Sequence, residues 1–189
     1  AQHAHFQHLI DRGVPLVFYD RVCTGVNASR VVVDDYAGAY AAVTHLVETG
    51  CRRVACFNAS MKLEISKNRY NGYCDALLKH GIKVDPSLVF QCDNRLDAER
   101  IMPEVLDRHD RPDAFFAVND DTAIGILYSA KRRGFRIPED ISVCGFTNGQ
   151  RAVACDPALT TVDQHGFQVG EAAAEILMRH VEGHIEKGK

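Results

Sequence analysis

The sequence has no C-x-x-C pair, no long apolar run and no excess of positive charge, and each absence excludes a class of function. A membrane span needs about 18 or more consecutive apolar residues, and no stretch approaches that length. The first eight residues lack the charged-then-apolar layout of a secretory signal, so we expect a cytoplasmic protein. A net charge of -3 gives the chain no electrostatic footprint for DNA, so any contact with nucleic acid requires another part of the protein.

The signature motifs of common enzymes are also missing. No G-x-G-x-x-G follows an apolar run, and no P-loop or G-x-S-x-G motif is present. A Cys144–His165 nucleophile pair rests on residue type alone. We expect surface positions rather than a metal site for the histidines near the two ends of the sequence, which are His3, His5, His8, His180 and His184. We therefore predict no metal, no cofactor and no enzymatic activity.

Cysteine is present in an odd number, seven, and several cysteines lie inside apolar runs, such as Cys56 and Cys144. A free cysteine behaves as a small buried hydrophobic residue. We expect these thiols to be buried and reduced, as in a reducing compartment.

One pattern occurs four times: a helical segment, then a glycine, then a short apolar run. The four glycines are Gly13, Gly50, Gly81 and Gly134. A glycine after a helix supplies the left-handed residue that ends it. Strands that alternate with helices predict an α/β fold with parallel βαβ units and right-handed crossovers.

Apolar periodicity places the elements more closely. We expect strands near 16–19, 54–57, 88–92, 114–118 and 141–146, and helices near 5–12, 36–47, 64–80, 96–109, 120–133 and 170–181. The chain opens inside the first of these helices, with no complete βαβ unit before it. We therefore expect an N-terminally truncated piece of a longer protein.

Polar residues follow several of the predicted strands. The pairs are Asp20-Arg21, Asp93-Asn94, Asn119-Asp120 and Thr147-Asn148. In an open parallel sheet, ligands bind outside the carboxyl ends of the strands. Carboxylates and amides there suit a polyhydroxylated ligand such as a sugar. The alternative is that some of these residues only cap the helices that follow.

Three blocks of sequence together resemble bacterial LacI/GalR-type transcription regulators. The first runs from Val31-Val32-Val33-Asp34-Asp35-Tyr36 to Arg53-Val54-Ala55, and the second contains Arg69-Tyr70-Asn71-Gly72-Tyr73 and Asn119-Asp120. The third and most specific block runs from Ile137-Pro138-Glu139-Asp140 through Gly145-Phe146 to Pro157-Ala158-Leu159-Thr160-Thr161-Val162 and Gln164. Their order and spacing cover nearly the whole chain.

The resemblance implies a periplasmic-binding-protein-like fold of two doubly wound parallel-sheet lobes joined by crossover strands. Residues 1–33 and 164–180 would form a partial N-terminal lobe, 34–163 the C-terminal lobe, and 181–189 a tail. The N-terminal lobe would be incomplete, and the family's DNA-binding headpiece would be absent.

The resemblance also assigns ligand contacts. Arg69 matches the family's central effector-binding arginine, with a surface or interlobe salt bridge as the alternative role. The other implied contacts are Asp20, Asn94, Asn119, Asp120 and Gln164. Asn94 occupies a position where members often place a stacking aromatic. Capping is the alternative for Asn119, and a hinge role for Gln164.

Thr147 is the clearest departure from the family pattern, because many members have aspartate in this turn. A hydroxyl cannot accept hydrogen bonds from two ligand groups in the way that the two oxygens of a carboxylate can. We therefore expect an effector that differs from those of the best-known sugar repressors or that binds more weakly, with a phosphorylated or acidic ligand as one hypothesis.

The resemblance implies a cytoplasmic homodimer whose contact includes Ile124, Leu127 and Tyr128. On this interpretation, a sugar or sugar phosphate bound between the lobes controls how tightly the headpiece binds operator DNA. Two alternatives remain: a periplasmic sugar-binding protein of a transporter, and an enzyme on the same scaffold.

Overall fold

The structure, a computed structural model, describes residues 4–23 and 25–183. His3, His184 and the end of the predicted tail lie outside the described residues. The chain folds as two compact units: unit 1 contains residues 1–33 and 165–189, and unit 2 contains residues 34–164. No helix of the described part is both long and apolar enough to cross a membrane.

Unit 2 is built on a five-stranded parallel sheet with the order β4-β3-β5-β6-β7. Its strands are β3 (Val54–Asn58), β4 (Val89–Gln91), β5 (Ala114–Ala117), β6 (Ser142–Thr147) and β7 (Thr160–Asp163). Cys56 pairs with Val89 on one side and with Phe116 on the other. The chain runs from β3 out to β4 and then returns across β3 to β5, so the strand order reverses between β3 and β5.

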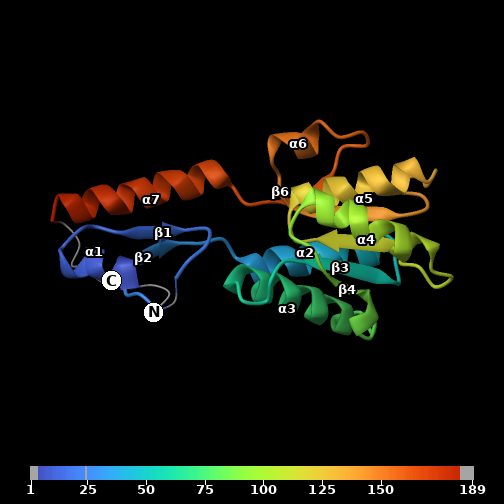
Figure 1. Ribbon diagram of the computed structural model, residues 1–189, viewed down its shortest axis with the longest axis horizontal. Helices are drawn as coiled ribbons and strands as arrows, with labels where there is room; N and C mark the ends of the chain where they lie inside the picture. The colour runs from blue at the N-terminus through green and yellow to red at the C-terminus, as the bar shows by residue number, and fades with distance from the viewer. Residues whose placement is uncertain (1–3, 24, 184–189) are drawn as a thin grey trace. The chain divides into compact units, whose positions relative to one another are not determined.

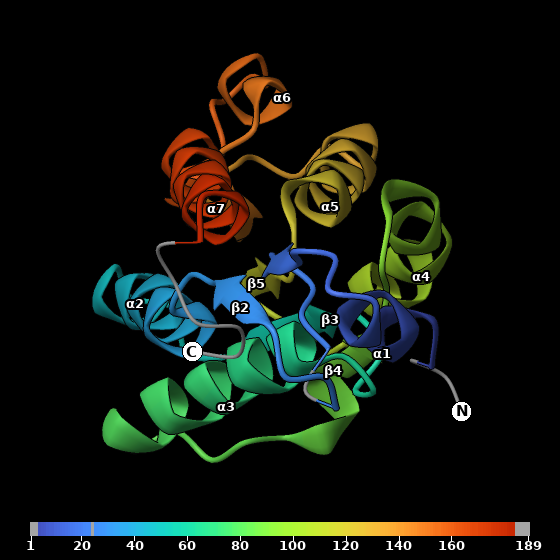
Figure 2. The ribbon, with the colours of Figure 1, turned by 90° about the vertical axis from the view of Figure 1, so that its left-hand side faces the viewer.

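Helices cover both faces of this sheet (Figures 1 and 2). Two of them, α2 (Asp35–Glu48) and α3 (Glu64–Lys79), pack together on one face. The other face carries α4 (Arg95–Asp107) and α5 (Asp120–Arg132), with the short α6 (Gln150–Val153) against α5 and η1 (Pro86–Leu88) before β4. The predicted parallel α/β class is confirmed.

Alternation along the strands divides the core into two layers. Phe57 and Phe115 point into the layer under α4 and α5. Cys56 and Phe116, their chain neighbours, point into the layer under α2 and α3. Successive side chains of a strand lie on opposite faces, and both faces are apolar here because helices cover both.

The helix ends follow the chemistry predicted from the sequence. The side chain of Asp34 accepts a hydrogen bond from the backbone N–H of Ala37 at 2.8 Å and so caps α2. All four predicted glycines have positive φ, between 73° at Gly81 and 109° at Gly50. This left-handed conformation carries little cost for glycine and lets the chain leave the helix sharply.

The cysteine prediction is confirmed for five residues. All seven thiols are free, and Cys23, Cys51, Cys56, Cys92 and Cys144 are buried. Cys74 and Cys155 are half-buried instead, and Cys74 packs against the core layer under α2 and α3.

Unit 1 has fewer elements. It contains α1 (Ala4–Asp11), the parallel strands β1 (Val17–Tyr19) and β2 (Ser29–Val31), and α7 (Gly166–Val181). Its small core consists of Phe18, Cys23 and Val26 with a few half-buried neighbours. The Ser29 hydroxyl lies 2.9 Å from Nε2 of His180 and links β2 to α7.

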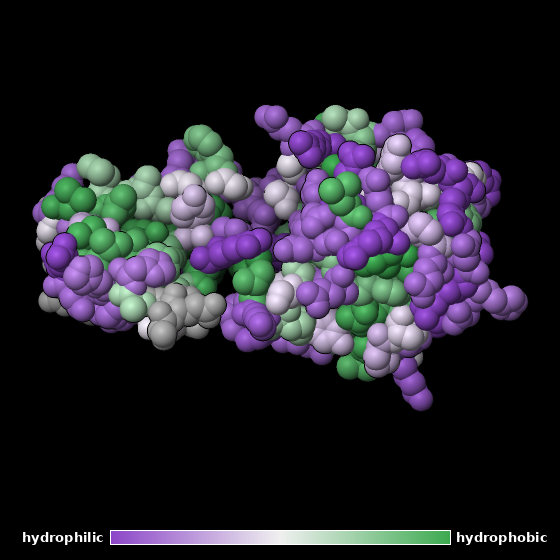
Figure 3. Space-filling view, in the orientation of Figure 1, coloured by the Kyte–Doolittle hydropathy of each residue, from purple (hydrophilic) through white to green (hydrophobic). Residues whose placement is uncertain are grey.

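Much of the apolar surface of unit 1 is exposed. Only Ala173 is buried in α7, although the helix is strongly amphipathic. Exposed apolar side chains of this unit include Tyr19, Val32, Phe167, Met178 and Val181. Figure 3 shows hydrophobic residues gathered over unit 1, at the left of the view, while the visible surface of unit 2 is mostly hydrophilic.

Candidate functional site

The candidate site lies at the carboxyl edge of the unit 2 sheet. Ligands of doubly wound sheets bind where the strand order reverses, and here this point is between β3 and β5. Asn58 ends β3, and Val118 and Asn119 follow β5. The predicted contacts Arg69, Asn94, Asn119, Asp120, Thr147 and Gln164 all belong to segments at this edge.

Arg69 is the most constrained of these side chains. It is 3% exposed, although it carries a full charge. Its Nε donates to Oδ1 of Asp35 at 2.8 Å, and its Nη2 lies 2.7 Å from the same oxygen. Nη1 donates to the carbonyl of Val118, and the guanidinium stacks 3.7 Å above the ring of Phe146.

This arrangement ties three parts of unit 2 to one guanidinium. Asp35 begins α2, Val118 follows β5 and Phe146 is on β6. A buried arginine is tolerated only when a carboxylate and further acceptors satisfy it, as they do here. Arg69 does form a salt bridge, but the bridge is buried inside unit 2 and is neither the surface nor the interlobe pair expected as the alternative.

Asn94 and Asn119 cap helices at the carboxyl edge. Oδ1 of Asn94 accepts from the backbone of Asp97 at 3.0 Å and starts α4. Oδ1 of Asn119 accepts from the backbone of Thr122 at 2.8 Å and starts α5, while its Nδ2 donates to the carbonyl of Asp93. The capping role expected as an alternative is present at both positions.

Asp120 is buried, and both of its oxygens have donors. Oδ2 accepts from the backbone N–H of Gly149 at 2.8 Å, and Oδ1 accepts from the hydroxyl of Thr161 at 2.5 Å. The carboxylate thereby fastens the start of α5 to the turn after β6 and to β7. It also lies where a Cβ on Gly145 would meet it at 2.5 Å, so this position has room only for glycine.

The turn after β6 has unusual backbone conformations. Thr147 has φ 143° and Asn148 has φ 58°, a region that non-glycine residues rarely adopt. Nδ2 of Asn148 donates to Oδ2 of Asp163 at 3.1 Å, and the backbone N–H of Gln164 reaches the carbonyl of Thr147 at 3.4 Å. Residues held this way cluster at ligand sites, and here the turn leaves Thr147 exposed.

Sequence reasoning assigns no ligand role to two buried polar groups of unit 2, Asp35 and Asn58. Two adjacent aspartates lie at the start of α2; Asp34 caps the helix, and Asp35 pairs with the arginine. Asn58, an amide at the end of an otherwise apolar strand, is buried. Its Nδ2 donates to the carbonyl of Ser66, while Oδ1 has no hydrogen-bond partner within the described structure. For Asn58 the sequence signal is an amide at the end of an apolar strand, and for Asp35 the local sequence offers no signal beyond helix capping.

Asp20 belongs to unit 1, where it follows β1, is exposed and has φ 57°. The predicted dimer residues lie on α5 in unit 2. Ile124 is half-buried, Leu127 is buried and Tyr128 is exposed. The Tyr128 ring is flanked by the guanidinium groups of Arg95 and Arg132 at 5.3 and 5.6 Å.

Cys92 and Cys144 of unit 2 are not activated nucleophiles. Burial raises the pKa of Cys144 to about 12 and that of Cys92 to about 11. A thiol with so high a pKa is not ionised at neutral pH, and the thiolate is the reactive form. Within residues 4–23 and 25–183, no group of three or more side chains is arranged to hold a metal ion.

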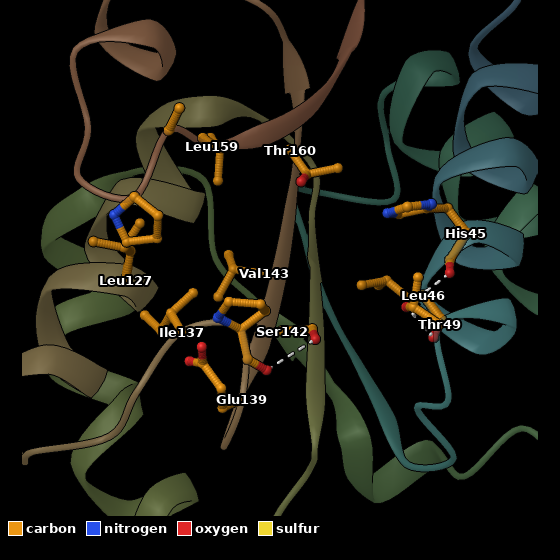
Figure 4. A pocket seen from close by; sticks show the side chains of 13 residues that line it. His45, Leu46, Thr49, Leu127, Ile137, Glu139, Ser142, Val143, Leu159 and Thr160 are labelled. Atoms are coloured by element: carbon orange, nitrogen blue, oxygen red, sulfur yellow. Dashed lines mark hydrogen bonds between the residues drawn. The ribbon is translucent and has the colours of Figure 1, made fainter.

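A cavity of about 440 Å³ lies at the opposite end of the sheet, where β6 and β7 begin (Figure 4). His45 and Leu46 of α2 form one wall, and Leu127 and Ile137 line the other. Glu139 and Thr160 add polar groups at the margin. Although the same strands contribute to both places, the residues that line this cavity differ from those at the carboxyl edge.

Comparisons with known proteins agree with this geometry. Residues 43–189 match the family described as periplasmic binding protein-like domain. The HTH-type transcriptional repressor CytR of Escherichia coli strain K12 is 33% identical over 176 residues, which cover 92% of this chain and 52% of the repressor. This chain therefore spans about half the length of the curated relatives it matches.

Solved structures give the same assignment. The complex of the transcriptional regulator CelR with cellobiose has a TM-score of 0.87 and 31% identity, over 96% of this chain and 56% of that one. A LacI family regulator from Enterococcus faecium with bound ribose has a TM-score of 0.86 and 26% identity, over 96% of this chain and 68% of that one. The chain belongs to the periplasmic binding protein-like domain family, in the form of the effector-binding core of LacI-type transcriptional regulators.

Proposed function

We propose that this chain is the ligand-sensing core of a transcription regulator, and that a small sugar-like ligand binds at the carboxyl edge of unit 2. The observation that carries the proposal is the set of polar groups gathered where the strand order reverses. Arg69, Asn119 and Thr147 come from three different segments: α3 and α5 begin at this edge, and β6 ends there. The ribose and cellobiose complexes of structural neighbours support the same ligand class.

The ligand acts by shifting a population of conformations. A ligand that contacts both lobes of the full protein favours one arrangement of them, and a helix-turn-helix headpiece outside this chain then binds operator DNA more or less tightly. The coupling is limited by the difference in ligand affinity between the two states, typically about 1–3 kcal/mol. The proposed contacts include Asp20, which follows β1 in unit 1, and Gln164, the last residue of unit 2.

Unit 1 is proposed to be part of a larger N-terminal lobe. Its exposed apolar side chains, such as Phe167 and Val181, would then be covered by further elements of that lobe. The curated relatives are about twice as long as this chain, which leaves room for those elements and the headpiece.

Homodimerisation through the outer faces of α4 and α5 is the proposed assembly. Tyr128 is exposed beside half-buried Ile124, with Leu127 behind them, and Leu96 of α4 is 74% exposed. Sedimentation should give a dimer mass that Tyr128→Glu reduces to that of a monomer. A monomeric wild type at high concentration would contradict this assembly.

A thermal-shift panel of sugars, sugar phosphates and purines tests the ligand proposal. A ligand at about 100 times its Kd adds roughly 2.7 kcal/mol to the free energy of unfolding. Thr147→Val keeps a β-branched side chain but removes the hydroxyl, so the shift should shrink. Thr160→Val, in the cavity at the other end of the sheet, is the matched control and should leave it unchanged. A shift lost in Thr160→Val alone would place the ligand in that cavity.

A further inference from the structure

The charge of the candidate site is set by the ion pair at its base. Arg69 and Asp35 have side chains that are only 4% and 6% exposed, and both contacts from the guanidinium reach the same carboxylate oxygen. At this separation and burial, the pair presents almost no net charge to a ligand at the strand ends. A ligand that reaches Arg69 meets hydrogen-bond donors rather than an uncompensated cation.

The four longer helices that start at this edge add no surplus positive charge. The N-terminus of a helix carries about half a positive charge and attracts anions. Each of these four has acid in its first turn: Asp35 in α2, Glu64 in α3, Asp97 in α4, and Asp120 with Asp121 in α5, whereas the four-residue α6 has none. These carboxylates offset the partial positive charge of the helix N-termini, which would otherwise attract a bound phosphate.

Other cations close to the edge are also beside carboxylates. Arg95 contacts Glu99 at 2.5 Å, and Arg151 lies 3.5 Å from Asp121. Lys62, exposed on the loop after β3, is a flexible cation that has to be controlled for in any experiment.

We propose that Asp35 determines the charge preference of the site: its buried pair with Arg69 makes the site select a neutral polyhydroxylated ligand and reject the phosphate ester of that ligand. The inference rests on the proposed ligand site and deepens it. The sequence alone raises an anionic effector as a hypothesis, because Thr147 replaces a carboxylate. Asp35 supplies a carboxylate from α2 instead and reverses that expectation.

Removing the charge of Asp35 should therefore change the preference of the site from neutral ligands to anions. Asp35→Asn keeps the shape and an oxygen acceptor for Nε of Arg69, but it leaves the arginine with net positive charge. A unit charge within a few ångströms of a partly buried ligand changes affinity by at least about tenfold. Asp35→Glu keeps the charge and is the matched control.

Inorganic phosphate is the probe, because it reports the charge preference of the site whatever sugar the protein binds. Calorimetric titrations should give an affinity for phosphate at least about tenfold higher in Asp35→Asn than in wild type or Asp35→Glu. The gain should disappear in Asp35→Asn combined with Arg69→Gln, and it should survive Lys62→Gln. An unchanged phosphate affinity in a folded Asp35→Asn protein would overturn the proposal.

A measurement on wild type keeps the proposal testable even where Asp35→Asn fails to fold. The buried Nε–H of Arg69 gives a resolvable ¹⁵N resonance, and phosphate should not shift it. A phosphate-dependent shift of that resonance would contradict the charge assignment.

The sugar panel reports on a separate question. If no neutral sugar binds while phosphate behaves as expected here, the proposed function fails and the role of Asp35 stands.

Discussion

Unit 2 and unit 1 contain the same kinds of elements, but they differ in the number of strands and in how deeply their core residues are buried. Unit 2 has five parallel strands with helices on both faces, and its largest side chains, such as Phe57 and Phe115, are fully buried. The described part of unit 1 has two strands and a core in which the best-buried residues, such as Phe18, are still 9% exposed. The candidate ligand groups are concentrated in unit 2, where packed strands and capped helices hold them in place.

The difference predicts where substitutions matter most, and the largest effect should come from the buried ion pair. Arg69→Met should lower the free energy of unfolding by about 3–5 kcal/mol, because it leaves the Asp35 carboxylate buried without its cationic partner. Urea denaturation measures this loss. The exposed pair of Arg136 with Asp140 is the control, and Arg136→Met should have a small effect. Equal effects of the two changes would contradict the importance of burial.

A matched pair of methionines compares the two units directly. Met102 in α4 is 0% exposed, whereas Met178 in α7 is 54% exposed. Met102→Ala should cost about 2–5 kcal/mol of stability through the cavity it leaves. Met178→Ala should change stability by less than about 0.5 kcal/mol. A large loss from Met178→Ala in this chain would show that α7 is covered in solution.

Two glycines extend the comparison to helix packing. A Cβ on Gly72 would meet the carbonyl of Tyr36 at 2.4 Å, so Gly72→Ala must separate α2 from α3. We expect it to destabilise the protein by about 1–3 kcal/mol. Gly170 in α7 has open space around it, and Gly170→Ala should raise stability by up to about 1 kcal/mol through helix propensity. Thermal denaturation of both variants checks the opposite signs.

The smallest effect at neutral pH concerns the buried thiols. Folding raises the pKa of Cys144 to about 12 from its ordinary value near 9, so the thiol form stabilises the native state. This contribution is fully present below about pH 9 and is lost as the pH rises toward 12. Stability measured between pH 8 and 11 should fall less in Cys144→Ala than in wild type. An identical pH dependence of stability in both proteins would contradict a raised pKa of Cys144 in the native state.

Sequence patterns predicted the parts of the fold that depend on local chemistry. Short continuous apolar runs located the strands of unit 2, apolar residues with a period of 3.6 located its helices, and Gly50, Gly81 and Gly134 marked helix ends. Shorter elements were harder, because β2 and α6 have three and four residues and show no clear period. Residues 160–163 were not among the expected strands, yet they form β7, which pairs with β6 at the edge of the sheet.

The sequence predicted where the candidate site residues lie, but it did not predict which partners their side chains contact. Residues after strands were expected at one edge of the sheet, and Asn94, Asn119 and Thr147 lie there. The pairing of Asp35 with Arg69 joins residues 34 positions apart, and nothing in the local sequence separates this role from helix capping. The same limit applies to Asp120, whose two oxygens are bound by donors from distant segments.

Hydrogen exchange with and without a ligand from the sugar panel tests the central claim most directly. If the ligand binds at the carboxyl edge of unit 2, slowed exchange should concentrate in the segments around Asn58, Asn119 and Thr147. Protection around His45 and Glu139 instead would contradict the account. It would assign the ligand to the cavity at the opposite end of the sheet.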